Sequence, residues 1–148
     1  MRFAAIMALA ASLATPGLAE DIVSVRASGD VETTMDALEA AVGKAGATVF
    51  ARVDHSGGAE SVGMTLPGSQ LLVFGNPMLG TPAMQDDPLA GLYLPLRVLV
   101  YEDGDGAVWL AYEDPAEMLD DLEIDDDAEY LGKMSGALSK LTAAAAGG

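Results

Sequence analysis

The chain has 148 residues, of which 23 are Asp or Glu and seven are Lys or Arg, so its formal net charge at pH 7 is −16. A charge of this sign and size repels phosphate backbones and anionic lipid headgroups, so we expect neither nucleic acid nor a membrane surface as a partner. Cysteine is absent, which excludes disulfides, redox thiol chemistry and thiolate metal sites.

The first 19 residues have the order of a secretory signal peptide. Arg2 precedes an apolar stretch over residues 3–14, and the small residues Gly17 and Ala19 follow it. The stretch is too short to anchor stably in a bilayer, and a signal peptidase accepts small residues three and one positions before its cut. We expect cleavage after Ala19 and a periplasmic or secreted domain that is free of the membrane once the leader is removed.

A short strand and a well-determined helix follow the leader. Residues 22–27 alternate apolar and polar side chains, although imperfectly. Asp30 fits a helix N-cap, and Gly46 supplies a left-handed stop at the other end. Between them, apolar residues recur at steps of three and four and so share one face of a helix; they are Val31, Met35, Leu38, Val42 and Ala45.

Two further strands are predicted in the next part of the chain. Residues 48–54 are rich in β-branched and aromatic side chains, and residues 70–74 are a continuous apolar run of strand length. The first of these strands delivers His55 to a polar, glycine-rich turn over residues 54–58, and residues 59–63 have the composition of a single helical turn.

The stretch over residues 75–95 is dense in Gly and Pro. Thr81 followed by Pro82 predicts a short helix that begins there, with threonine as the cap and proline at the first helical position. Residues 96–101 and 108–112 are two more predicted strands. Asp-Gly pairs between them predict a hairpin.

The C-terminal part is helical and acidic. Pro115 begins a helix that the acidic run at 125–127 interrupts, and a last amphipathic helix over residues 131–141 frays into an alanine-rich tail. The order β-α-β-β-(short α)-β-β-α contains no βαβ repeat long enough for a doubly wound sheet. We therefore predict a single α+β domain, in which an antiparallel-dominated sheet carries helices on one face.

Residues 48–115 resemble the domain-of-unknown-function family 302. The strings that carry the resemblance are TVFARVDHSGGAESVGM and LLVFGNPMLGTPAMQDDPLAGLYLPLRVLVYEDGDGAVWLAYEDP, and more weakly the capped helix from Asp30. The resemblance implies a compact, β-α-β(4)-α-like α+β domain that is commonly associated as a dimer, and it brings no established activity. It covers neither the leader nor residues 120–148, so we expect the family-like domain over 20–119 and an acidic helical extension after it.

Two segments of the family-like domain carry candidate chemistry. The glycines of residues 75–85 permit close backbone approach, and free amide hydrogens at a helix start at Thr81 would point toward an anion or another small ligand, with Arg52 or Arg97 as a source of positive charge. His55 is the only histidine, and imidazole readily exchanges protons near neutral pH. The predicted ligand-binding residues are Asp54, His55, Gly75, Asn76, Pro77, Gly80, Thr81 and Gln85. The alternatives are a structural loop and a structural histidine.

Metal binding is an alternative for two groups of residues. The thioethers of Met64, Met78 and Met84 with His55 are donors that Cu(I) accepts, although methionine more often fills cores. The acidic residues between 117 and 129 invite Ca²⁺, but the glycine and glutamate of an EF-hand loop are out of register there, and a solvated acidic face is the simpler interpretation. We predict no bound cofactor and no metal site.

The sequence therefore predicts a non-enzymatic module that binds a small ligand or a protein partner through residues 75–85, near His55. A homodimer through the sheet or its helices would come with it. The alternatives are an enzyme with His55 as general acid or base, for which the standard nucleophile motifs are missing, and a Met/His copper-handling protein.

Overall fold

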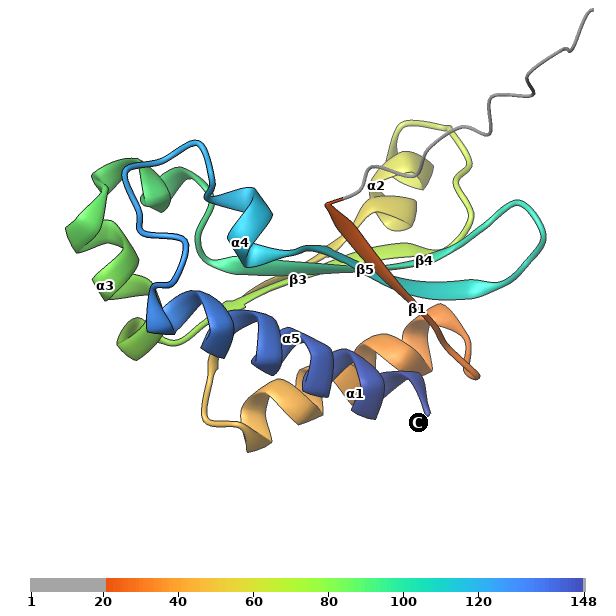
Figure 1. Cartoon of the computed structure of the whole chain (residues 1–148). Coiled ribbons are helices and arrows are strands. Elements are labelled where there is room, and N and C mark those ends of the chain that lie inside the picture. The colour runs from red at the N-terminus through yellow and green to blue at the C-terminus, as the bar shows by residue number, and fades with distance from the viewer. Residues whose placement is uncertain (1–20, 148) are drawn as a thin grey trace, which may run out of the picture.

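The computed structural model describes residues 21–147 and has a five-stranded antiparallel sheet at its centre (Figure 1). The strands are β1 (Ile22–Arg26), β2 (Thr48–Asp54), β3 (Ser69–Gly75), β4 (Leu96–Glu102) and β5 (Val108–Glu113), in the spatial order β1-β5-β4-β3-β2. Every neighbouring pair is antiparallel. This confirms the predicted α+β fold. The predicted leader, residues 1–19, lies outside the described residues.

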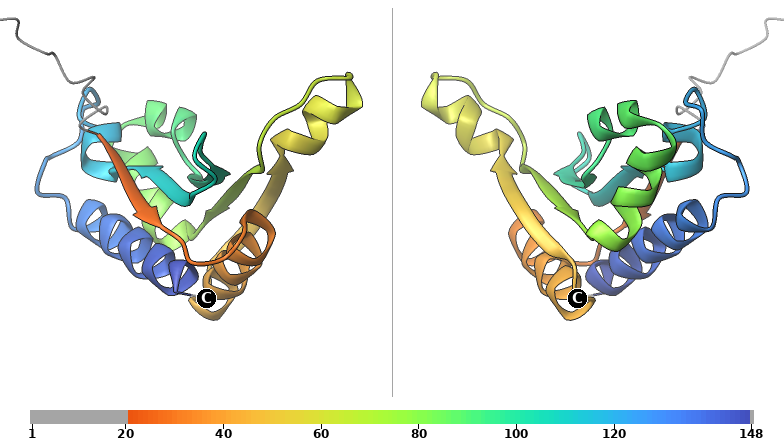
Figure 2. Two further views of the ribbon diagram at one scale, coloured as in Figure 1. Left: turned by 90° about the vertical axis from the view of Figure 1, so that its right-hand side faces the viewer. Right: turned by 90° about the vertical axis from the view of Figure 1, so that its left-hand side faces the viewer.

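Two long helices cover one face of the sheet. α1 (Val31–Lys44) begins after Asp30, whose carboxylate accepts a hydrogen bond from the Thr33 N–H at 2.7 Å, and it ends before Gly46, which has φ of +76°. The helix therefore starts and stops where the sequence indicates. α5 (Glu129–Ala146) packs beside α1, beneath the sheet in Figures 1 and 2.

The main hydrophobic core lies between the sheet and these two helices. Every second residue of β3, β4 and β5 is buried, as the alternation of side chains along a strand requires. Among the fully buried side chains of this core are Met35 and Leu38 of α1, Phe74 of β3, Leu110 of β5, and Met134 and Leu138 of α5.

Because α5 closes this core, the predicted boundary at residue 120 is not a boundary of the folded domain. The acidic extension that we expected after residue 119 is instead a short acidic connection followed by a core helix. Its alanine-rich end is also packed: Ala145 and Ala146 are buried, and the Ala146 carbonyl accepts hydrogen bonds from the Ser28 N–H at 2.9 Å and the Ser28 Oγ at 3.0 Å.

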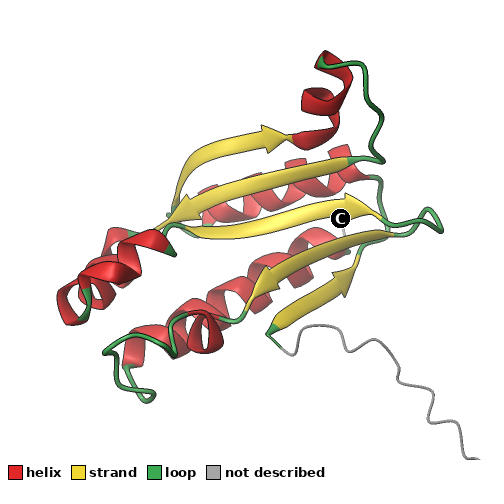
Figure 3. Cartoon of the chain, turned by 90° about the horizontal axis from the view of Figure 1, so that it is seen from above, coloured by secondary structure: helices red, strands yellow, loops and turns green. Residues whose placement is uncertain are grey.

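The short helices lie beyond the strand ends, and within residues 21–147 no helix covers the strands on the second face of the sheet (Figure 3). They are α2 (His55–Ser61), α3 (Pro77–Asp86), the 3₁₀ helix η1 (Pro88–Leu92) and α4 (Pro115–Met118). A second, smaller core joins α3 and η1 to the start of α5 through Ala83, Ala90, Leu119 and Leu131. None of the helices in residues 21–147 is long and apolar enough to cross a membrane.

The glycine-rich segments differ from the sequence prediction. The polar turn predicted at residues 54–58 is the start of α2. The helix predicted to begin at Thr81 begins at Pro77, because Asn76 is its N-cap and accepts the Met78 N–H at 2.9 Å. Pro77 thus takes the first helical position that the prediction gave to Pro82, which lies inside the helix.

Candidate functional site

The pairing of β2 with β3 places the two halves of the predicted site at opposite ends of the sheet. Thr48 pairs with Gly75, and Asp54 pairs with Gln70. His55 therefore follows one end of the strand pair and Asn76 follows the other. A strand of seven residues is roughly 20 Å long. The structure corrects the expectation that His55 and residues 75–85 share one surface, because they do not come together.

The His55 end is a small polar helix. The Asp54 carboxylate accepts the Gly57 N–H at 2.9 Å and the Ser56 hydroxyl at 2.8 Å, and these bonds, that of Gly57 first, lower the pKa of Asp54. His55 is exposed, and no residue of α2 is buried. The acid–base hypothesis needed Asn76 or Thr81 within hydrogen-bond reach of His55, and both lie at the far end of the strand pair.

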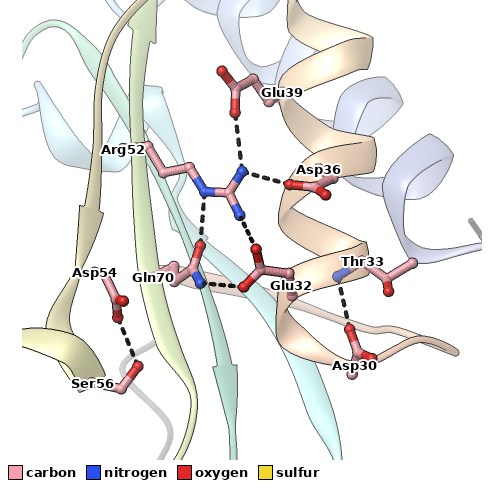
Figure 4. A network of polar contacts seen from close by, with 9 residues as sticks. All are labelled: Asp30, Glu32, Thr33, Asp36, Glu39, Arg52, Asp54, Ser56 and Gln70. Carbon is pink, nitrogen blue, oxygen red and sulfur yellow. Dashed lines mark hydrogen bonds and ion pairs between the residues drawn. The ribbon is translucent and has the colours of Figure 1, made fainter.

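Between the two ends, Arg52 joins β2 to α1 (Figure 4). Its Nη1 donates to Asp36 at 2.6 Å and to Glu39 at 3.2 Å, its Nε donates to Gln70 Oε1 at 2.8 Å, and its Nη2 lies 3.7 Å from Glu32. The hydrogen bond to Asp36 is the main cause that raises the pKa of Arg52. This guanidinium is held by carboxylates of α1 and does not supply charge to residues 75–85.

The other end of the strand pair holds an apolar cavity of about 200 Å³. It is lined by Phe50, Gly75, Asn76, Pro77, Leu79, Gly80, Thr81, Met84, Leu94, Pro95, Leu96 and Met134. Five of the eight predicted ligand-binding residues are among them, namely Gly75, Asn76, Pro77, Gly80 and Thr81. Asp54, His55 and Gln85 are not.

A β-bulge and two glycines shape this cavity. The register of β2 against β3 shifts between Val49 and Ala51, which leaves Phe50 unpaired and free to stand over the end of β3. A methyl group on Gly75 would lie 3.6 Å from Phe50 Cε2 and 3.4 Å from Pro95 Cβ. On Gly80 it would lie 3.7 Å from Leu94 Cδ1. Larger side chains at these two glycines would occupy the space between the cavity walls.

The chemistry of the cavity differs from the predicted anion cradle. The Asn76 carbonyl accepts the N–H groups of Leu79 at 2.9 Å and Gly80 at 3.0 Å, and Thr81 lies inside the helix, so the amides at the helix start are already bonded. The described lining residues include no Lys or Arg, and Arg97 pairs with Glu113 at 3.2 Å. The cavity is therefore suited to an uncharged apolar group.

Sequence reasoning missed most of the apolar walls. Leu79 and Met84 lie within the predicted segment 75–85 but were not among the predicted ligand-binding residues. The walls outside that segment are Phe50, Leu94, Pro95, Leu96 and Met134. An aromatic residue in the predicted strand at 48–54 was a usable signal for Phe50. Met134 carried no local signal, because α5 reaches the cavity only after the chain has completed the sheet.

The candidate metal ligands do not converge. Met64 follows α2 at the His55 end, whereas Met78 and Met84 belong to α3 at the cavity end. Within residues 21–147, the His, Asp and Glu side chains form no group of three that could hold a metal ion.

The sequence is similar to one protein family and to a group of proteins named as ion channels. The family described as Domain of unknown function DUF302 matches residues 23–141. Fluoride-specific ion channel FluC 1 of Brucella suis biovar 1 (strain 1330) is 45% identical over 95 residues, which are 64% of this chain and 37% of that protein. FluC 2 of Brucella melitensis matches at the same identity, with 35% of its length covered. The chain thus spans little more than a third of these relatives.

A solved structure has the same fold. The crystal structure of an uncharacterized conserved protein DUF302 from Bacillus stearothermophilus has a TM-score of 0.68 and 19% sequence identity, and the likeness covers 86% of this chain and 97% of that chain. The family match itself ends at residue 141, inside α5, which agrees with the packing of α5 in the main core.

Proposed function

This chain belongs to the family Domain of unknown function DUF302, and from that premise we propose that it is a non-enzymatic binding domain whose cavity beside α3 accepts an uncharged apolar group. The observation that carries the proposal is the cavity of about 200 Å³ with apolar walls. An apolar cavity of about 150 Å³ is enough to hold a benzene-sized molecule.

The composition of the lining supports binding in preference to catalysis. Small-molecule sites are mostly apolar with a few polar groups that fix orientation, and here Asn76 and Thr81 are those polar groups. Among the described residues that line the cavity there is no Asp, Glu, His, Lys or Tyr to act as a general acid or base. An exposed histidine about 20 Å away along β2 does not replace them.

The test uses small uncharged probes and two matched glycine variants. Gly80 and Gly58 each occupy the fourth position of their helices, α3 and α2. Gly80→Leu places a side chain toward Leu94 and Met84, whereas a methyl group on Gly58 meets nothing within 4 Å. We expect indole or benzene to raise the melting temperature of the wild type and of Gly58→Leu, and not of Gly80→Leu. A panel of such probes that shifts neither melting temperature nor NMR resonances contradicts the proposal.

A second proposal concerns the channels. Proteins named fluoride-specific ion channels contain, in one chain, a segment 45% identical to 95 residues of this protein. In these proteins the similar segment is joined covalently to the rest of the channel chain, so contacts between the two parts are intramolecular and are favoured. Separate chains form the same contacts with lower affinity. We propose that this domain associates with a fluoride channel as a separate chain. The assay is fluoride efflux from vesicles that hold the channel, with and without purified domain, together with co-elution of the two proteins. Unchanged efflux and separate elution contradict it.

Export and homodimer formation stay predictions. Export predicts that the protein recovered from cell fractions begins at Glu20, which N-terminal sequencing determines. A homodimer predicts twice the chain mass in light scattering after gel filtration. The full chain mass in the cytoplasmic fraction would contradict the first prediction, and a monomer at micromolar concentration would contradict the second.

A further inference from the structure

The rim of the cavity is apolar and exposed. Phe50 is 58% exposed, Met78 80%, Met84 39% and Leu92 78%. Phe50 and Met84 line the cavity. In the chain, Met78 stands between the lining residues Pro77 and Leu79, and Leu92 follows Gly91, on which a methyl group would lie 3.5 Å from Met84 Sδ. Exposed apolar side chains gathered around a cavity are typical of an interaction surface.

An acidic strip adjoins this rim. Tyr130, in the first turn of α5, donates a hydrogen bond to Asp86 at 2.7 Å. The Glu123 N–H, in the connection between α4 and α5, donates to Asp87 at 3.1 Å. The end of α3 is therefore bonded to this connection and to the start of α5. Residues 117–129 carry eight acidic side chains and no basic one, and all eight are exposed. They are Glu117, Asp120, Asp121, Glu123, Asp125, Asp126, Asp127 and Glu129.

We propose that this surface docks a basic protein segment, which inserts one large apolar side chain into the cavity and lays its Lys and Arg side chains against residues 117–129. The proposal rests on the proposed function, because it uses the same cavity. Binding energy at protein interfaces is concentrated in a few anchors that fill pockets, and complementary charge accelerates and directs the encounter.

The partner follows from the charges and the exposed rim together. A small apolar ligand held inside the cavity would explain the lining but not the exposed side chains of Met78 and Leu92 outside it. A second copy of this chain would bring another net charge of −16 against the acidic strip. An anionic membrane is repelled in the same way. A cationic segment with an apolar anchor complements both the strip and the cavity.

The probe is a short fluorescent peptide with one tryptophan flanked by lysines on both sides, measured by fluorescence polarisation at low salt. One control peptide replaces the tryptophan by serine, and another replaces the lysines by glutamates. We expect the serine peptide to bind about thirtyfold or more weakly, as the loss of a hot-spot anchor does. The glutamate peptide should not bind, and salt should weaken the lysine peptide.

Three variants of the full chain locate the contact. Gly80→Leu should abolish binding of the lysine peptide. The triple variant Asp125→Asn, Asp126→Asn, Asp127→Asn should weaken it about tenfold at low salt and much less at high salt. The matched triple variant Glu60→Gln, Glu102→Gln, Asp105→Asn removes three exposed acids at the far end of the sheet, and it should bind as the wild type does.

The outcomes separate this proposal from the one on which it rests. If indole binds and the lysine peptide does not, the docking proposal is overturned while the cavity remains a ligand site. If neither binds, both fail. If the peptide binds Gly80→Leu as tightly as the wild type, or if both triple variants weaken it equally, the docking proposal is overturned. Binding to neutral phosphatidylcholine vesicles that the peptide does not compete away also overturns it, in favour of a membrane.

Discussion

The two ends of the β2–β3 pair look alike in sequence and differ in what they enclose. Each continues into a glycine-containing helix with an Asx N-cap, Asp54 for α2 and Asn76 for α3. α2 buries no residue, whereas α3 buries Ala83 in the second core and forms one wall of a cavity. Glycine in such a segment therefore indicates a site only where other elements pack behind it.

Exposed apolar residues occur at both ends as well. Val62, Met64 and Leu66 are 70%, 66% and 49% exposed in the connection after α2. Met78 and Leu92 are exposed to a similar degree at the other end, but they adjoin a cavity and an acidic strip. We infer that a pocket for an anchor, rather than exposure, distinguishes the two surfaces.

The largest expected effect is a difference in the free energy of unfolding between two methionine variants, one at the cavity end and one at the His55 end. Met134 is 1% exposed and lines the cavity, and Met64 is 66% exposed. Met134→Ala should lower the free energy of unfolding by about 2–5 kcal/mol, because it removes buried contacts and enlarges the cavity. Met64→Ala should change it by less than about 0.5 kcal/mol. Urea denaturation measures both, and equal losses would contradict the comparison.

Replacing the helix N-caps Asn76 and Asp54 should have the next largest effect on stability. Asn76→Ala should cost about 1 kcal/mol, because the Met78 N–H loses its bond to the Asn76 side chain, and it should also reduce indole binding, since Asn76 lines the cavity. Asp54→Ala should loosen α2 and leave indole binding unchanged. Thermal unfolding and probe titration of the two variants test this. Loss of indole binding in Asp54→Ala would show that the two ends are coupled.

Local patterns were sufficient to predict most elements of the fold. The periodicity and caps of residues 30–46 and the Asp-Gly pairs between residues 96–101 and 108–112 specify structure within a few residues of themselves. The cap of α3 was misassigned because both Asn76-Pro77 and Thr81-Pro82 satisfy the same local rule. The helix begins at the first of them because it follows β3 directly.

The candidate site was only half predictable for a different reason. Its glycines and Asn76 form one contiguous stretch that the sequence displays. The apolar walls outside this stretch come from β2, from the connection before β4 and the first residue of β4, and from α5, and they meet through the sheet order and a β-bulge. The separation of His55 from this stretch follows from antiparallel pairing, so register, rather than composition, decides it.

A smaller effect on the free energy of unfolding is expected from Tyr130, which joins α5 to α3. Burial, followed by the hydrogen bond to Asp86, raises the pKa of Tyr130 to about 12. In the unfolded chain a tyrosine has a pKa of about 10. The contribution of protonated Tyr130 to the free energy of unfolding is therefore complete below pH 10 and is lost as the pH rises through 12. Tyr130→Phe should cost less than about 1 kcal/mol at neutral pH and remove this alkaline dependence. Unfolding of both proteins between pH 9 and 12 measures it, and parallel curves would contradict it.

The smallest expected effect is a difference between the two N-caps in how their hydrogen bonds depend on pH. The Gly57 N–H and the Ser56 hydroxyl hold the pKa of Asp54 below 3.8, so its capping of α2 is present above that value and is lost as the pH falls through the lower, folded-state pKa. Asn76 does not titrate, and the first turn of α3 should be unaffected. We expect the exchange protection of the Gly57 amide to fall on acidification while that of the Met78 amide stays constant. Asp54→Asn is the control: it keeps a capping oxygen and should abolish the pH dependence at Gly57. Equal loss of protection at both amides would mean that acid unfolds the whole domain before the α2 cap opens.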